Sequence, residues 1–387
     1  MKSKIYFPGL DALRGLAALA VLFGHMLQSL KYFGLPESSY QGYGDLAQLA
    51  VTFFFVLSGF LITYLLLKEK EKTATIHVRM FYIRRILRIW PLYFLIVLVS
   101  FSLYFFTDFF NLQHPAIYLS LLLYCIGLAN IALDLHLSLG STEHLWSIGV
   151  EEQFYFFWPL LVRKAKNILS LLIWVIVGFL FFKAAILVFN RVSSQPVSEF
   201  LLAFILRFRI DCMAIGGLAA YIAFTNHRLF GKLVRKYTDL VLALIIVVLI
   251  LFRARFHHLN FEVYSVLFAL LILNICFCQQ PILKLRGFLL SYLGKISYGV
   301  YMYHMLIITG FQYFFRKGLA PSDESIREWV YLIGIPVITL LVASVSFEFF
   351  EKRILNLKGR FTIIKSGGGE DEPEKMEKQL SYLQKVN

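Results

Sequence analysis

The chain has 387 residues, of which 59% are hydrophobic and 16% charged, and its mean hydropathy is +0.69. About a quarter of the residues of a soluble globular protein are charged, so this composition excludes an ordinary soluble domain. The formal net charge of +14 does not indicate nucleic acid as a partner, because Lys and Arg also gather in the cytoplasmic loops of membrane proteins.

Apolar blocks recur along the whole chain, many of them near the roughly 20 residues that a helix needs to cross a bilayer. These blocks predict a bundle of transmembrane helices. They lie near 10–33, 46–67, 89–107, 117–133, 144–162, 168–189, 199–224, 239–252, 261–279, 291–315 and 329–350.

Basic residues gather between these blocks, and the positive-inside rule places such loops in the cytoplasm. All these basic loops can lie on one side of the membrane only if the stretch 108–162 crosses the membrane once. The shorter block 117–133 should therefore be re-entrant or interfacial. We therefore predict an all-α polytopic protein of the cell (inner, cytoplasmic) membrane, with about 10 transmembrane helices and both termini cytoplasmic. The basic clusters are Lys2 with Lys4, Lys68–Arg88, Arg163–Lys166, Arg228–Lys236, Lys284–Arg286 and the residues from Lys352 onward.

The last residues differ in composition from the rest of the chain. Residues 356–387 are mostly polar, with the run Ser366-Gly-Gly-Gly-Glu-Asp-Glu-Pro near their start, which is typical of a disordered segment. We expect a membrane domain over 1–355 and a cytoplasmic, disordered tail over 356–387.

Several ionisable residues fall inside the apolar blocks, where a charge at the bilayer centre costs about 2.5–3.5 kcal/mol on insertion scales. Ionisable residues in these positions are candidates for a functional site. They are Asp11, Arg14, His25, Glu151, Glu152, Arg207, Arg209, Asp211, His304 and Glu348.

Arg14 and His25 are eleven residues apart, close to three helical turns, so they share one helix face about 16 Å apart. Counting residues from the membrane surfaces places His25 at the depth of Glu151 and Glu152, only one of which should face it. A histidine beside a carboxylate in a sheltered cavity suits general-base chemistry. The alternative is a snorkelling arginine and a structural histidine.

Other polar residues favour structural interpretations. Arg207 and Asp211 are four residues apart and should neutralise each other on one helix. His257 and His258 are adjacent in a loop, where we expect solvated side chains and no metal.

Six motifs in order resemble those of the membrane-bound acyltransferase 3 family. The first resembles the family's opening motif, a basic residue, ten others and a histidine; the third is its RxxR element. The motifs are Phe7–His25, Phe53–Ile62, Arg85–Arg88, Trp146–Pro159 and, more loosely, Arg209–Ala219 and Ser297–His304.

This resemblance implies transfer of an acyl group, most often acetyl, to a carbohydrate hydroxyl. The donor implied is cytoplasmic acetyl-CoA as co-substrate, with no tightly bound cofactor. The acceptor would be a surface polysaccharide, a glycolipid or a lipid-linked glycan. Some members carry an SGNH hydrolase-like domain. None is present in this sequence, so the membrane domain should finish the transfer or pass the group to another protein.

The same resemblance suggests roles for individual residues. Arg14, Arg85 and Arg88 should cradle the phosphates of coenzyme A, because guanidinium groups recognise phosphate well. His25, oriented by Glu151 or Glu152, should act as general base or as a covalent acyl carrier. Supporting roles, for substrate or structure, fall to Asp11, Ser58, Trp146, Ser147, Tyr155, Arg209, Asp211 and His304.

A different function class also fits buried charges in ten spans. Secondary carriers use ionisable residues to relay protons, and such a protein would export a glycan or a small solute. Against a carrier, the two halves of the sequence show no clear repeat.

Overall fold

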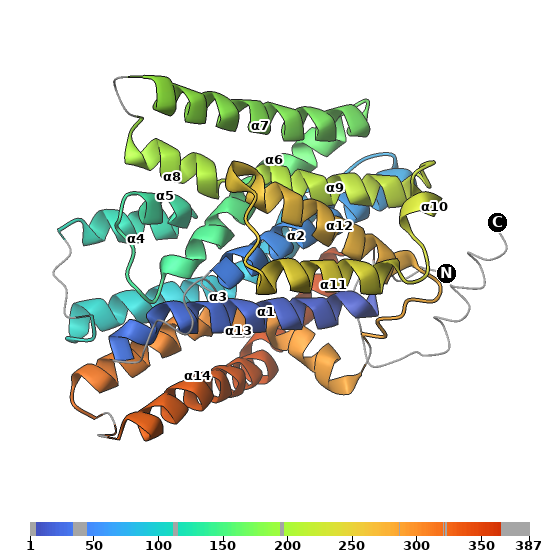
Figure 1. Cartoon of the computed structure of the whole chain (residues 1–387). Coiled ribbons are helices and arrows are strands. Elements are labelled where there is room, and N and C mark those ends of the chain that lie inside the picture. Colours follow the sequence, from blue (N-terminus) through green and yellow to red (C-terminus); the bar gives the residue numbers. More distant parts are fainter. Residues whose placement is uncertain are drawn as a thin grey trace.

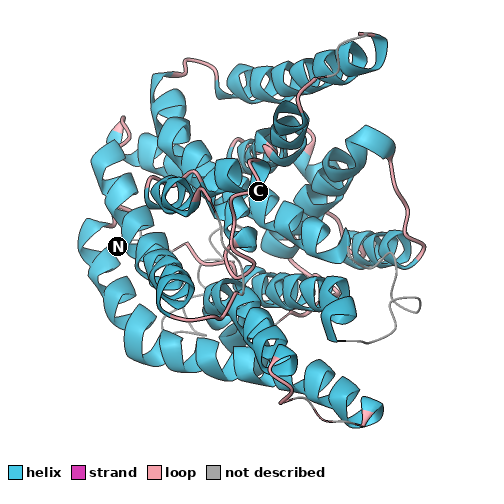
Figure 2. Cartoon of the chain, turned by 90° about the vertical axis from the view of Figure 1, so that its left-hand side faces the viewer, coloured by secondary structure: helices cyan, strands magenta, loops and turns pink. Residues whose placement is uncertain are grey.

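The computed structural model describes residues 5–33, 45–110, 115–193, 197–285, 287–319, 321 and 323–364. Within these residues the chain forms helices and no β-strand (Figures 1 and 2). Lys2, Lys4, Arg286 and the predicted tail from residue 365 lie outside the described residues.

The helices follow one another with short connections. The turns are η1 (Leu30–Phe33), η2 (Glu143–Leu145), η3 (His257–Leu259) and η5 (Lys358–Phe361), with a π-helical turn, η4 (Phe347–Glu351). The α-helices are α1 (Pro8–Ser29), α2 (Asp45–Thr73), α3 (Val78–Phe106), α4 (Ile117–Cys125), α5 (Ala129–Asp134), α6 (Trp146–Lys164), α7 (Ile168–Val192), α8 (Glu199–Arg207), α9 (Ile210–Phe224), α10 (Phe230–Leu233), α11 (Thr238–Leu251), α12 (Asn260–Phe277), α13 (Phe288–Arg316), α14 (Glu324–Ser346) and α15 (Lys352–Leu357).

Local sequence fixes several helix starts. Pro8 occupies the first turn of α1, where its missing N–H costs nothing. The side chain of Asn167 accepts a hydrogen bond from the backbone N–H of Ser170 at the start of α7. Asp323 accepts one from Ile326 in the same way at α14. These caps satisfy backbone groups that the helix itself leaves unpaired.

Six helical segments of the described residues are long and apolar enough to cross a membrane. They comprise α1, α2, α3 and α7, with η3–α12 and α14 continued to η5. Shorter apolar helices accompany them, among them α11 with 14 residues. Between α3 and α6, α4 and α5 have nine and six residues, too few to cross about 30 Å of hydrocarbon. The all-α polytopic membrane fold and the non-spanning block 117–133 are therefore confirmed.

The helix bundle has two ends. We call the end at which α2 meets α3 the basic end, because Lys and Arg gather there; it lies on the right in Figure 1, beside α10. The other we call the opposite end. The most apolar window of α2 is 78% buried, whereas that of α7 is 22% buried. Thus α2 is central, and α7 presents its apolar side chains to the outside.

Glycines bring α1 and α13 together side by side, in parallel. A side chain at Gly15 would collide with Leu293 and the Gly294 backbone, and one at Gly294 would collide with the Asp11 backbone. The contact fixes one register for both helices. Ten residues further along each helix, His25 and His304 therefore face each other.

The second motif packs α2 against α9 in a similar way. A Cβ at Gly59 would overlap the Met213 backbone, and one at Gly216 would overlap the Val56 backbone. Small residues permit this close approach in membrane helices.

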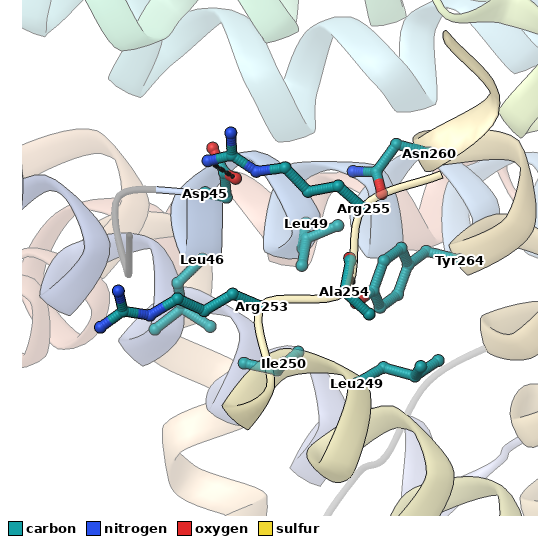
Figure 3. A pocket seen from close by; sticks show the side chains of 10 residues that line it. All are labelled: Asp45, Leu46, Leu49, Leu249, Ile250, Arg253, Ala254, Arg255, Asn260 and Tyr264. Carbon is teal, nitrogen blue, oxygen red and sulfur yellow. Dashed lines mark hydrogen bonds and ion pairs between the residues drawn. The ribbon is translucent and has the colours of Figure 1, made fainter. Parts of the chain in front are cut away.

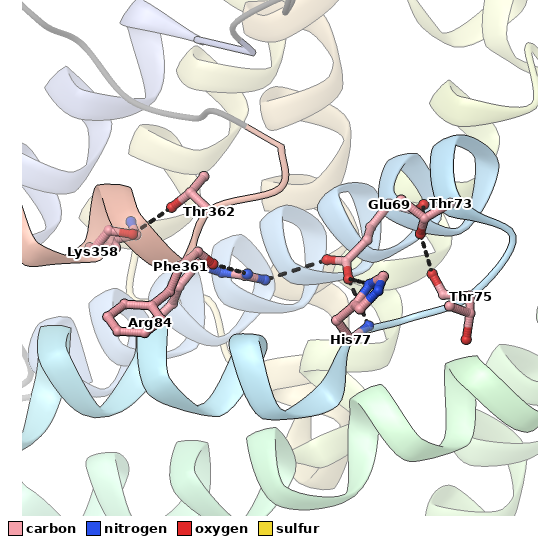
Figure 4. A network of polar contacts seen from close by, with 8 residues as sticks. All are labelled: Glu69, Thr73, Thr75, His77, Arg84, Lys358, Phe361 and Thr362. Carbon is pink, nitrogen blue, oxygen red and sulfur yellow. Dashed lines mark hydrogen bonds and ion pairs between the residues drawn. The ribbon is translucent and has the colours of Figure 1, made fainter.

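The C-terminal residues 352–364, which we call the C-terminal strap, fold back onto the bundle. The boundary predicted at 355/356 falls within α15, which continues to Leu357, and η5 packs against α3. Arg84 Nη1 donates a hydrogen bond to the Phe361 carbonyl at 2.8 Å, and Arg84 Nη2 lies 3.5 Å from Glu69 Oε2 (Figure 4). Buried Glu69 also accepts from the His77 backbone N–H at 2.8 Å, so this carboxylate joins α2 to α3 directly and to the strap through Arg84.

At the opposite end, a small pocket lies between the start of α2 and the loop after α11 (Figure 3). Asp45 and Arg255 form an ion pair of 2.6 Å beside it. Its volume of about 20 Å³ suits a single water molecule and no substrate.

Candidate active site

A larger cavity of about 630 Å³, which we call the chamber, lies between α1, α2, α3, α6, α13 and the segment after α14. Ligand pockets are typically about 300–1,000 Å³. The exposed residues Asn356 and Gly359 line it, so the chamber reaches the surface at the basic end. Its polar lining is Tyr6, Asp11, Arg14, Ser58, Tyr64, Arg85, Arg88, Ser147, Glu151, Tyr155, Lys295, Ser297, Tyr298, Tyr301, Glu351, Asn356, Lys358 and Thr362.

The chamber wall carries more positive than negative side chains. Arg14, Arg85, Arg88, Lys295 and Lys358 are basic, against the three carboxylates of Asp11, Glu151 and Glu351. All three arginines predicted to bind the donor thus lie in one wall.

These arginines differ in how far the protein satisfies them. Arg14 pairs with Asp11 at 3.0 Å. The guanidinium of Arg85 lies 5.4 Å from the ring centres of both Phe81 and Tyr155, and its buried Nε has no hydrogen-bond partner among the described residues. Arg88 forms no ion pair within them. Unsatisfied guanidinium groups beside a cavity favour an anionic ligand.

Glu151 is held inside the chamber by two hydroxyl groups. Ser58 donates to one carboxylate oxygen at 2.8 Å, and Tyr155, one turn along α6, donates to the other at 2.9 Å. Glu152 faces α3 instead, where its Oε2 accepts from the indole N–H of Trp90 at 3.0 Å. Of these two glutamates, only Glu151 therefore lines the chamber.

Ser147 and Tyr301 form the inner end of the chamber. The Tyr301 hydroxyl donates a hydrogen bond to the His144 carbonyl at 2.7 Å. The Ser147 hydroxyl, 2.6 Å away, in turn donates to the Tyr301 oxygen. The Tyr301 ring also contacts the rings of His144 and His304, with centres 5.3 and 5.6 Å apart.

Three imidazoles, which we call the histidine column, lie beyond this tyrosine. The rings of His25 and His304 stack with centres 5.2 Å apart, and His144 lies edge-on to His304 at 4.8 Å. His304 Nδ1 lies 2.5 Å from the Tyr301 carbonyl, so Nδ1 carries the proton. The other nitrogen, Nε2, is left as an acceptor with no partner among the described residues.

The predicted pairing of His25 with Glu151 or Glu152 is wrong. Glu151 is bonded to Ser58 and Tyr155, and His25 contacts His304. The depth estimate failed because α6 does not begin at the membrane surface. Residues 115–145 fold into the bundle, so the level of His25 is reached already at His144, which is 2% exposed. Glu151 lies seven residues, about 10 Å, further toward the basic end.

A second cluster of predicted residues lies away from the chamber. Arg209 bonds Gln48 Oε1 at 2.9 Å, and its guanidinium lies 3.4 Å from the Phe261 ring centre and 5.5 Å from that of Trp146. Trp146 is buried in the core. These contacts give Arg209 and Trp146 a structural position.

The predicted pair of Arg207 and Asp211 is also wrong. The helix breaks between α8 and α9, so the two residues are not one turn apart, and Arg207 pairs with Asp134. Neither Asp211 oxygen has a hydrogen-bond partner among the described residues. Glu262, which lies close to Asp211, pairs with Lys183 at 2.6 Å.

Sequence reasoning missed several residues in or beside the chamber, among them His144, Lys295, Tyr301, Glu351 and Lys358. His144 lies two residues before the motif Trp146–Pro159, and Tyr301 lies inside the motif Ser297–His304. Their positions could have identified them as site residues. Lys295 and Glu351 belong to no predicted motif, and Lys358 was counted only among the basic residues from Lys352 onward. The fold of the strap places Lys358 at the chamber.

These features define a class of protein: an all-α polytopic membrane protein with a basic chamber at one end and buried histidines beyond it. The chain belongs to the acyltransferase 3 family, because the model of that family, described as an acyltransferase domain, matches residues 7–348.

Curated relatives agree with this family. The chain is 27% identical over 378 residues to the peptidoglycan O-acetyltransferase OatA of Listeria monocytogenes, covering 91% of this chain and 56% of the relative. It is also 27% identical to the O-acetyltransferase OatA of Staphylococcus aureus, covering 92% and 58%. The chain thus spans somewhat more than half the length of these relatives. No solved structure matched the chain.

Proposed function

We propose that this chain transfers an acetyl group from acetyl-CoA to a hydroxyl of a cell-envelope carbohydrate. The names of the relatives support O-acetylation, and that of the Listeria relative supports a peptidoglycan-like acceptor. The single observation that carries the donor is the chamber, whose basic wall reaches the surface at one end. The positive-inside rule supports a cytoplasmic position for that end.

The chamber suits the shape of an acyl-CoA. Arg85 and Arg88 would hold phosphates near the mouth, and the uncharged pantetheine arm would extend along α13 toward Tyr301. From Lys295 to Tyr301 the wall runs six residues, about 9 Å. The thioester would then reach the Ser147–Tyr301 hydrogen bond, directly before the histidine column.

His25 is the proposed base. It is half-buried, and the Nε2 lone pair of His304 lies in the same column. In direct transfer, His25 takes the proton of the acceptor hydroxyl, the oxygen attacks the thioester carbonyl, and the proton returns to the departing thiolate. In covalent transfer, an unprotonated ring nitrogen of His25 attacks the thioester carbonyl, the C–S bond breaks, and the thiolate takes the proton of the other ring nitrogen. The acceptor hydroxyl then attacks the acyl-imidazole, and its proton returns to the ring.

The sequence predicted that Glu151 or Glu152 would orient His25, but the contacts of Glu151 support a different role. Its two hydrogen bonds fix Ser58 and Tyr155, and Tyr155 lies beside Arg85. We propose that Glu151 positions the donor-binding wall rather than the base.

Replacing His25 tests the proposal. His25→Ala should lower the rate of acetyl transfer by about 10²–10⁴-fold, the usual contribution of a general base. The loop variant His258→Ala, whose side chain is exposed, is the control. Full activity of purified His25→Ala would refute the role of this histidine.

Mass spectrometry of surface glycans from a deletion strain tests the reaction class. Loss of acetyl mass from intact glycans is expected. Loss of whole glycans would instead support export by a carrier.

A further inference from the structure

The C-terminal strap contributes to the chamber although it lies beyond the family match, which ends at residue 348. Leu355, Asn356, Lys358, Gly359 and Thr362 all line the cavity. The strap is therefore part of the site in this chain, and its role does not follow from the shared family motifs.

Lys358 is the charged residue that the strap places in the chamber wall. It is half-buried, and it lies in the field of Arg88, Arg85, Arg84 and Arg14. Lys358 forms no ion pair with a carboxylate in the described part of the chain. Like charges gathered in a partly desolvated place repel one another unless an anion joins them.

The other basic residues nearby are not equally available to a ligand. Arg14 is paired with Asp11, and Arg84 is shared between Glu69 and the Phe361 carbonyl (Figure 4). Among the described residues, Arg85, Arg88 and Lys358 are thus left without a carboxylate partner, as is Lys295 on α13. The bond from Arg84 to Phe361 holds the strap on α3, three residues from Lys358, so the lysine has a defined place.

We propose that Lys358 binds a phosphate group of the nucleotide end of the acyl-CoA and completes a three-cation site with Arg85 and Arg88. This inference rests on the proposed function, since it assigns a binding residue for the same donor. The strap then forms one side of the donor entrance.

Calorimetric binding to the full-length chain in detergent tests this assignment, with CoA, 3′-dephospho-CoA and pantetheine as ligands. Lys358→Ala should weaken CoA binding about tenfold, as expected for loss of one charge-assisted hydrogen bond, and pantetheine binding should not change. Lys358→Arg should bind CoA nearly as the wild type does. Lys352→Ala, on the exposed face of the strap, is the matched control.

The truncated ligand identifies the phosphate. If Lys358→Ala weakens CoA but not 3′-dephospho-CoA, the lysine binds the 3′-phosphate. If both weaken alike, it binds the diphosphate. Should Lys358→Ala fail to fold, Lys358→Gln carries the same expectation, because it removes the charge but keeps a polar side chain.

Two failures are distinguishable. Wild-type chain that binds CoA, with Lys358→Ala and Lys358→Gln binding it equally well, would overturn the inference and leave the proposed function standing. Wild-type chain that binds no CoA would overturn the proposed donor and this inference together.

Discussion

The parallel contact of α1 and α13 determines where His25 meets His304, and Gly294→Ala tests it. The added Cβ would lie 2.5 Å from the Asp11 carbonyl carbon, whereas ordinary contacts begin at 3.4 Å. The helices must therefore separate by roughly 1 Å, and such overpacking typically costs about 1–3 kcal/mol. The gain of about 1 kcal/mol in helix propensity from Gly to Ala does not offset the upper part of that range.

Two measurements check this prediction. Titration of SDS into mild detergent should show a lower free energy of unfolding for Gly294→Ala. Acetyl transfer should also fall, because the separation continues to the imidazole pair ten residues further along. Gly310→Ala on the same helix is the matched control, since no atom lies within 4 Å of its added Cβ. If Gly294→Ala were as stable and active as Gly310→Ala, the close contact and the register derived from it would be refuted.

Tyr301→Phe removes the hydroxyl bonded to Ser147 and to the His144 carbonyl, so kcat should fall by more than tenfold while KM for acetyl-CoA stays within about twofold; a large change in KM alone would place Tyr301 in donor binding instead. At the opposite end, the hydrogen bond from Lys317 holds the pKa of Asp108 below its usual 3.8. A depressed folded-state pKa means that the pair stabilises the chain above about pH 4 and that this contribution is lost as pH falls further. Lys317→Ala should therefore flatten the pH dependence of Tm between pH 5 and 3, and an unchanged profile would contradict the pairing.

Much of the fold could be predicted because bilayer physics constrains it strongly. Apolar block length and loop charge identified the block 117–133 as non-spanning, and α4 and α5 are indeed too short to cross. Motif positions also predicted correctly that Arg14, Arg85 and Arg88 would share one wall.

Depth and partners were less predictable, because both depend on where helices begin and break. Counting residues from a presumed surface placed Glu151 beside His25, whereas the buried start of α6 puts His144 there. Spacing predicted that Arg207 would pair with Asp211, but a break at 208–209 redirects Arg207 to Asp134. Low apolar content suggested that 356–364 would be disordered, although one hydrogen bond to Arg84 holds the strap on α3.

The separation of the chamber from the histidine column has a physical consequence for transfer. Phosphates belong at the basic mouth, because moving their charges toward the bilayer centre would add several kcal/mol for each one. The acetyl group is uncharged and bears no such cost. In the reaction that we propose, a donor anchored at Arg85, Arg88 and Lys358 presents only its thioester to Tyr301. The proposed carbohydrate acceptor then meets the acetyl group from the opposite end while the nucleotide remains where it bound.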